Sequence, residues 1–420
     1  MPWTSSASPQ APEAGPVGAG GPEGPGPLAA FPEARERAVL LALCLLAGTR
    51  VLAYSAAFPL YGNMDEQSHL DLVVKYASGR VPARVEPFGP ESSLLVVRYA
   101  TPEYLSRPGE LPGGTIPPPF WSLARTPHVA AAERELVTHW ATSPNHESTG
   151  PPVYYAVAAL WYRLGSLLGL EGGRAVYWIR YLNAVAWALL VWMSWRRLGL
   201  LLPRNRLVRL GVPLLLAVFP QDVVYCISND ALSPLAFAAA FFALLEVARG
   251  AGLKGHLAAG TLAACAFLVK VSNIAIAGML VAVCLLRLRA ARRAGAMRAE
   301  WPRLTGLAAS AAAPVALWMG RNLLVGGDLT ATTEKVKLLG WSPKPLGEWL
   351  DHPLFGPGGL ATFWNGVTAT MWRGELVWHR SSMEWPALDR GYALATLVAV
   401  TTMSLSLLSR GARPEPMERT

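Results

Sequence analysis

Apolar stretches that approach membrane-spanning length recur along this chain. A helix that crosses the hydrocarbon core of a bilayer needs about 20 consecutive, mostly apolar residues. Hydrophobic residues make up 52% of the 420 residues. Charged residues make up only 15%, whereas soluble domains carry about 25%. We therefore expect an all-α, multi-pass protein of the cell membrane.

The basic residues predict the orientation of the chain. The formal net charge is +9, but the arginines are not spread over one polar face, so we expect no nucleic-acid partner. They gather at the ends of apolar stretches, which is the pattern of cytoplasmic loops. The clusters are Arg196 and Arg197; Arg204, Arg206 and Arg209; and Arg287, Arg289, Arg292, Arg293 and Arg298.

Alternation between these loops predicts about eight spanning helices and two large extracytoplasmic segments, 61–150 and 325–390. The apolar stretch 152–170 cannot also span without reversing this order, so we expect it to be a juxtamembrane or re-entrant helix. Residues 1–36 should be a disordered cytoplasmic N-terminus, 37–410 the transmembrane domain, and 411–420 a cytoplasmic tail. The expected spans are 38–60, 176–195, 207–221, 231–248, 256–271, 272–287, 304–324 and 391–409.

Two adjacent acids, Asp65 and Glu66, follow the first predicted span, and His69 comes shortly after them. Charge beside hydrocarbon is costly, so such acids are candidates for a functional site. A carboxylate there can act as a general base, and desolvation should raise its pKa. The alternative is that the pair caps a helix and its first turn.

Three further charged residues fall near the same end of their predicted helices. Asp230 has no basic neighbour in the sequence, and with Asp65 and His69 it can hold a divalent cation, Mg²⁺ or Mn²⁺, through oxygen ligands. Lys270 and Arg321 can bind a phosphate, or they can extend to the membrane interface as isolated cations do.

Aromatic residues accompany these charges. Tyr154 belongs to a Gly-Pro-Pro-Val-Tyr-Tyr segment that starts a helix, and it can also close one wall of a site. Trp364 and Trp372 lie in the second extracytoplasmic segment, where tryptophan can stack on sugar rings or anchor the chain at the interface. We leave both interpretations open.

The order of these motifs resembles a known family over residues 38–410. It is similar to the multi-pass glycosyltransferases of the GT-C fold that use polyprenol-phosphate sugars, such as protein mannosyltransferases and lipid A aminoarabinose transferases. The motifs are Asp65-Glu66 with His69, the Gly150–Tyr155 helix start, Asn229-Asp230, Leu268-Val269-Lys270 and Arg321-Asn322.

This resemblance implies a GT-C-like bundle and specific roles for the residues. Asp65, with Glu66 beside it, would be the base or the carboxylate that orients the acceptor. Asp230 would help to hold a metal or the acceptor, and Lys270 and Arg321 would contact the donor phosphate. With His69 and Tyr154 these residues form the expected substrate site.

The implied activity is transfer of a sugar from a polyprenyl-phosphate donor to a hydroxyl of a glycan, lipid or protein. It would occur at the extracytoplasmic face by a single inverting displacement. The alternatives are a lipid or polysaccharide transporter, and a non-catalytic subunit of a cell-envelope assembly complex. A transporter predicts charges near the middle of the bilayer, whereas here, Arg50 apart, charges lie mainly at helix ends.

Overall fold

The computed structural model describes residues 33–62, 65–203, 205–219 and 222–410. The disorder predicted for the N-terminus therefore falls almost entirely outside the described residues, and the predicted C-terminal tail falls entirely outside them. Within the described part, regular structure is almost all helical, and each of the two small sheets has two strands. The all-α prediction is confirmed for this part of the chain.

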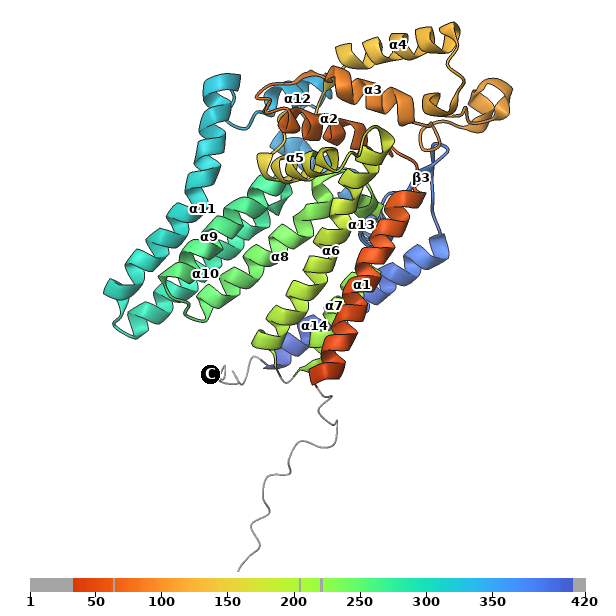
Figure 1. Ribbon diagram of the computed structural model, residues 1–420. Coiled ribbons are helices and arrows are strands. Elements are labelled where there is room, and N and C mark those ends of the chain that lie inside the picture. Colours follow the sequence, from red (N-terminus) through yellow and green to blue (C-terminus); the bar gives the residue numbers. More distant parts are fainter. Residues whose placement is uncertain (1–32, 63–64, 204, 220–221, 411–420) are drawn as a thin grey trace, which may run out of the picture.

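One layer of the molecule is a bundle of long helices that run side by side (Figure 1). The closest packing is between α9 and α11, between α1 and α6, and between α8 and α9. The bundle helices are α1 (Glu33–Ala57), α6 (Gly173–Leu201), α7 (Arg206–Val218), α8 (Asn229–Ala248), α9 (Leu253–Val269), α10 (Ala275–Arg293) and α11 (Met297–Gly326).

Four helical segments of the described residues are long and apolar enough to cross a membrane. In the segment Arg35–Ala57 only 22% of the apolar window is buried inside the protein, and in Val271–Arg293 only 17% is. Most of the apolar surface of these two segments therefore faces outward. Helices also occupy the other four predicted spans, but α7, α9, α11 and α14 (Pro386–Arg410) do not meet both criteria. The four segments are Arg35–Ala57, Gly173–Leu201, Asn229–Ala248 and Val271–Arg293.

Glycine permits the closest contact in the bundle. A side chain at Gly260 in α9 would place its Cβ 2.3 Å from the carbonyl oxygen of Leu307 in α11. Only a residue without a side chain lets these two backbones approach so closely. At its other end, α11 stops at Gly327, whose φ of 76° closes the last turn through a hydrogen bond to Leu323.

The second layer, which we call the cap, lies at one end of the bundle and consists of residues 61–62 and 65–167 together with α12 (Figure 1). The first predicted extracytoplasmic segment forms most of it. Its strands pair antiparallel, Glu86 with Asn145 and Pro87 with Pro144. Its elements are α2 (Glu66–Ala77), β1 (Glu86–Pro87), α3 (Pro90–Tyr99), α4 (Pro127–Thr142), β2 (Pro144–Asn145), α5 (Pro152–Leu167) and α12 (Thr333–Leu338).

Helix α5 joins the cap to the bundle. It begins at Pro152, where proline suits the first turn of a helix, and it packs across α2 and α6. With 16 residues it is shorter than a spanning helix, as expected for 152–170. A buried cluster that includes Leu70 and Val73 of α2, Tyr155 of α5 and Ile179 of α6 fills this junction.

The second predicted extracytoplasmic segment contains a helix that the sequence analysis did not predict. Helix α13 (Gly359–Arg373) packs against α14. Trp372 stacks on Tyr392 with ring centroids 5.5 Å apart, and the Trp364 Nε1 donates to the carbonyl oxygen of Ala393. Both tryptophans thus make helix–helix contacts. A short hairpin of β3 (Val377–Trp378) and β4 (Ser381–Ser382) follows α13.

Candidate active site

Asp65 lies between α1 and α2 in a left-handed backbone conformation with φ 53°. Asp tolerates this region better than most residues because its short side chain can hydrogen-bond locally. Asp65 occupies the N-cap position of α2, but its side chain makes no hydrogen bond to the first turn of that helix. The side chain is 53% exposed, and its Oδ2 lies 3.4 Å from Nε2 of His146. Strained backbone at an exposed acid is typical of a functional position.

The pKa of Asp65 differs from our expectation. The hydrogen bond from His146 lowers this pKa, and burial, which raises it, has the smaller effect. The predicted rise through desolvation is therefore wrong, because a partner compensates for the loss of water. Asp65 is an ionised carboxylate that still has room to accept a hydrogen bond from a substrate.

Glu66 is fully buried and fully engaged. Arg180 donates to both of its carboxylate oxygens, from Nε and from Nη2, at 2.6 Å each. The backbone N–H groups of Tyr61 and Ile227 donate to the same oxygens at 2.7 and 2.9 Å. No oxygen of Glu66 faces solvent, so we revise its expected catalytic role: Glu66 positions the residues around it.

Arg180 links Glu66 to the end of α1. Its guanidinium also donates to three backbone carbonyls, one in the last turn of α1 and two just after it, at 2.8 Å each. The last carbonyls of a helix have no partner within it, so a buried arginine is well placed to satisfy them. The pair with Glu66 thus fixes the turn that leads to Asp65. The three carbonyls belong to Ser55, Phe58 and Pro59.

His69 lies one turn into α2 with its ring buried. Its Nδ1 is 2.8 Å from the hydroxyl of Tyr155 in α5. Burial lowers the pKa of His69, while the negative charges of Glu147, Asp230 and Asp65 oppose this effect. The three acids thus lie near enough to act on one ring.

Glu147 and Lys335 form an ion pair that links the two predicted extracytoplasmic segments. Burial raises the pKa of Glu147, but the charges of His69 and Lys335 outweigh burial and lower it. The sequence analysis missed both residues as site residues. Glu147 could have been identified from its position just before the Gly-Pro-Pro turn, whereas no motif marks Lys335.

Asp230, which has no basic neighbour in the sequence, forms a direct ion pair with the distant Lys270. Asp230 lies in the first turn of α8, where its N–H donates to the hydroxyl of Ser228 at 3.1 Å. Lys270 follows the end of α9 in an extended conformation, which brings its ammonium group to the start of α8. Both side chains are about one-third exposed, so a ligand can reach the pair.

Arg321 has a different role from the one predicted. Its guanidinium donates to the carbonyl oxygens of Val81 and Pro82 and lies 5.0 Å from the centre of the Trp318 ring. It therefore holds the loop after α2 against α11. Because these contacts use its donors, we revise the expected contact with a donor phosphate.

Tyr154 lies beneath the site rather than in its wall. The side chain is fully buried, with its ring centroid 5.3 Å from that of Tyr155. Its hydroxyl has no hydrogen-bond partner among the described residues. A direct contact with substrate, as predicted, does not fit this burial.

The residues that come together at this junction of cap and bundle are called here the junction cluster. They come from α2, the turn before α5, α8, the end of α9 and α12. The predicted residues Glu66, Arg321 and Tyr154 lie outside the cluster and support it. Its members are Asp65, His69, His146, Glu147, Asp230, Lys270 and Lys335.

The cluster does not fit a divalent cation. No group of three or more His, Cys, Asp or Glu side chains in the described part of the chain is arranged to hold a metal ion. Asp65 and Asp230, the predicted ligands, are engaged by His146 and Lys270 instead. The proposed chemistry therefore contains no metal step.

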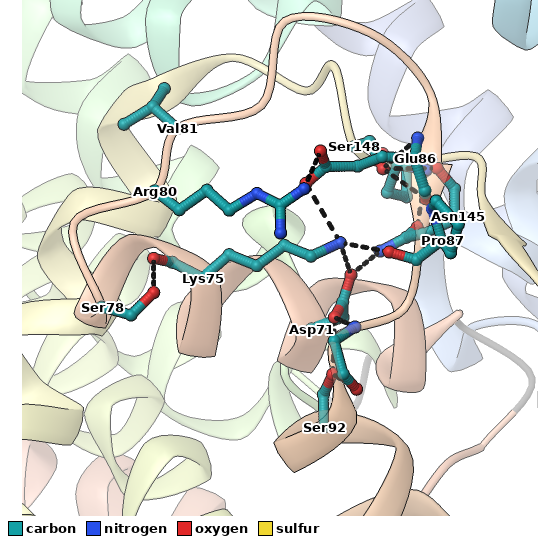
Figure 2. A network of polar contacts seen from close by, with 12 residues as sticks. Asp71, Lys75, Ser78, Arg80, Val81, Glu86, Pro87, Ser92, Asn145 and Ser148 are labelled. Carbon is teal, nitrogen blue, oxygen red and sulfur yellow. Dashed lines mark hydrogen bonds and ion pairs between the residues drawn. The ribbon is translucent and has the colours of Figure 1, made fainter. Parts of the chain in front are cut away.

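A second network holds the cap together (Figure 2). Asp71 of α2 is fully buried and accepts four hydrogen bonds, one of them from Lys75 at 2.6 Å. The others come from the side chains of Asn145 and Ser92, at 2.8 and 2.5 Å, and from the backbone N–H of Gly89 at 2.7 Å. A buried carboxylate is tolerated when its oxygens accept hydrogen bonds in this way.

This network also places His146. The Asn145 Nδ2 donates to the carbonyl oxygen of Ser68 at 2.9 Å as well as to Asp71. Both acceptors belong to α2, so the residue that follows Asn145 is held at the start of that helix. His146 reaches Asp65 as a consequence.

Comparison with known proteins gives one match. A family model described as "Predicted membrane protein (DUF2142)" matches residues 50–353, which include every member of the junction cluster. No curated protein and no solved structure matches the chain. Together with the apolar helices, this match establishes a helical membrane protein. The chain belongs to the DUF2142 family of predicted membrane proteins.

Proposed function

We propose that this protein is a membrane glycosyltransferase of the GT-C type. It moves a sugar from a polyprenyl-phosphate donor to an acceptor hydroxyl at the extracytoplasmic face, and about eight of its helices span the membrane. The observation that carries the proposal is the junction cluster. It brings the half-exposed, ionised Asp65 together with two lysines at the end of an apolar bundle.

The orientation of the helices supports this location. The arginine clusters of α6 and α10 lie near the ends of those helices that are remote from the cap (Figure 1). Loops rich in Lys and Arg stay in the cytoplasm. The cap and the junction cluster therefore belong on the extracytoplasmic side, where a lipid-linked donor presents its sugar at the bilayer surface.

The chemistry requires one proton transfer and one displacement. Asp65 accepts a hydrogen bond from the acceptor hydroxyl and takes its proton as the oxygen attacks the anomeric carbon. The bond between that carbon and the phosphate oxygen breaks, and the electron pair leaves with polyprenyl phosphate. Attack from the side opposite the leaving group inverts the anomeric centre.

The cations of the cluster suit the leaving group. Negative charge develops on the phosphate as its bond to the sugar breaks, and fixed positive charges stabilise it. Lys270 and Lys335 each face a carboxylate in the resting protein, Asp230 and Glu147 respectively. These pairs keep both ammonium groups in place before the donor arrives.

The lowered pKa of Asp65 fits this role. In a displacement of this kind the acceptor oxygen loses its proton once its bond to carbon is well advanced, so a weak base suffices. His146 beside Asp65 keeps the carboxylate ionised and oriented.

The proposal predicts that Asp65→Asn abolishes sugar transfer in membranes supplied with polyprenyl-phosphate sugars. Removing a general base costs about 10²- to 10⁴-fold in rate. Asp351→Asn is the matched control, because it makes the same change at an exposed acid outside the cluster. Incorporation of labelled sugar should fall to background only in the Asp65 variant. Equal incorporation by both variants contradicts the assignment of the base.

A transport function is less well supported. Arg50, the charge that lies within the first span, donates to the carbonyl oxygen of Ala217 at 3.0 Å and to the hydroxyl of Tyr225 at 2.6 Å. It therefore joins α1 to the end of α7 and does not line a path. Movement of a lipid-linked sugar across the membrane without transfer would favour the transporter.

A further inference from the structure

Two cavities adjoin here: the larger lies between the cap and the ends of α1 and α6, and the smaller lies within the cap between α3 and α4. The larger has a volume of about 710 Å³ and the smaller about 360 Å³. Both volumes fall in the range of small-molecule sites, about 300–1,000 Å³. Arg98, Tyr99 and Trp121 line both, so the two form one cleft. No member of the junction cluster lines it.

Several aromatic rings line this cleft. Tyr99, Phe120, Trp121 and Tyr177 all line it. Trp121 lies in a short turn of the cap and is 61% exposed. A large ring in such a place costs free energy in water and gains it when a ligand covers the ring.

The cleft is already shaped without a ligand. The ring of Tyr99 lies against Gly172 and Gly173 at the start of α6. A Cβ would come within 2.2 Å of the Tyr99 hydroxyl oxygen at Gly172, and within 2.9 Å of the ring at Gly173. Gly172 also has φ 57°, which few other residues adopt. The two glycines thus fix the place of this ring.

Polar groups fixed in the cleft complete the site. In the smaller cavity Glu133 accepts hydrogen bonds from Arg98 at 2.8 Å and from Arg125 at 3.2 Å. In the larger cavity, Glu103 Oε2 is buried without a hydrogen-bond partner among the described residues. A buried carboxylate oxygen of this kind gains free energy from a hydroxyl donor. Arg174 and Glu171 also line the larger cavity, so the cleft as a whole has three arginines and three glutamates.

We propose that this cleft binds a carbohydrate, namely a short oligosaccharide of the acceptor. Sugar rings present apolar C–H faces, which stack on the negative faces of aromatic rings, and hydroxyl edges, which donate to a carboxylate such as Glu103. The charges lining the cleft are balanced, which suits a neutral ligand. The acceptor assignment rests on the proposed glycosyltransferase function, whereas binding itself does not.

Binding of the purified full-length protein to an array of mannose-, glucose-, galactose- and arabinose-containing oligosaccharides tests the proposal. At least one oligosaccharide should bind, and Trp121→Ala should weaken its binding about tenfold, since one stacked ring contributes up to about a factor of ten. Trp341→Ala is the matched control, because Trp341 is 62% exposed and lies outside the cleft. It should bind as the parent does.

Two results overturn the proposal: no binding of any oligosaccharide by the parent, or equal binding by the two tryptophan variants. The binding assay contains no sugar donor, so it measures the cleft separately from sugar transfer. Binding without any sugar transfer by the parent would leave the cleft intact and contradict the proposed function.

Discussion

At the scale of single residues, the acidic motif at Asp65 can be recognised in the sequence, but residues from distant segments determine the pKa of its carboxyl group. Asp65 and His69 stand out in the sequence because acids and a histidine follow an apolar stretch. Their surroundings depend on His146 and Lys335, which come from distant segments. The direction of the shift in the Asp65 pKa was therefore predicted wrongly. Desolvation follows from the position of Asp65 beside an apolar stretch, whereas the compensating partner, His146, comes from a distant segment.

Asp222 shows the opposite case, an acid whose partners do not compensate for burial. It lies in the link between α7 and α8, and its Oδ1 has no hydrogen-bond partner among the described residues. That oxygen occupies the space where a side chain at Gly374 would lie. Burial raises the pKa of Asp222 to about 6, against the backbone hydrogen bonds that lower it.

We predict that Asp222→Asn stabilises the protein at neutral pH. A carboxyl group whose pKa is raised on folding destabilises the fold increasingly as pH rises above its unfolded pKa, and the full cost is reached above its folded pKa. From 3.8 to about 6, that cost is up to about 3 kcal/mol at pH 7.5 and roughly half as much at pH 5.

Thermal unfolding in detergent micelles at both pH values measures this effect. The variant should unfold at a higher temperature than the parent at pH 7.5, and the gain should shrink at pH 5. Asp351→Asn, at an exposed acid, should show no such pH dependence. A gain that is independent of pH would mean that charge burial is not its cause.

At the scale of secondary-structure elements, the order of helices in the bundle follows from the sequence. Apolar length and arginine clusters suffice to place a helix at each expected span, although α9 already ends at Val269, before Lys270. The cap was not predictable in this way. Its helices are short and held by buried polar networks such as that of Asp71, and the sequence carries no periodic signal for such contacts. The same holds for α13, whose tryptophans pack against α14.

The ion pair of Glu66 and Arg180 should be the strongest single link between cap and bundle. Glu66→Ala leaves a buried guanidinium without its carboxylate, which costs about 3–5 kcal/mol. Glu110→Ala is the matched control, because Glu110 pairs with Arg380 on the surface, where such pairs contribute about 0–1 kcal/mol.

Limited proteolysis and thermal unfolding of the two variants check this prediction. The Glu66 variant should lose protection of the cap and unfold at a markedly lower temperature, whereas the Glu110 variant should behave as the parent. Equal stability of both variants would show that the pair does not join the two layers.

At the scale of the whole molecule, the two layers correspond to two environments. The apolar bundle suits lipid, and the cap gathers the polar networks, the junction cluster and the aromatic cleft at one end (Figure 1). The alternation of the helices explains why acids and bases of distant segments meet at this end. It does not predict which of them pair with one another: Asp230 pairs with Lys270, whereas Arg321 binds backbone carbonyls.

Orientation in the membrane can be measured with single cysteines. Thr115→Cys places an exposed thiol in the cap, and Arg293→Cys places one at the far end of α10. A membrane-impermeant maleimide added to intact cells should label only position 115, and position 293 should react after the membrane is opened. Labelling of position 293 in intact cells would reverse the assigned orientation.

The role of Asp65 in sugar transfer can be tested most directly on the purified protein. The most direct test follows one turnover by the purified protein in lipid nanodiscs, with a labelled polyprenyl-phosphate sugar and the oligosaccharide that binds the cleft as acceptor. We predict that the parent and Asp351→Asn release one polyprenyl phosphate for each sugar transferred, with inversion at the anomeric carbon, and that Asp65→Asn does neither. Transfer by the Asp65 variant at the rate of the parent would contradict the account.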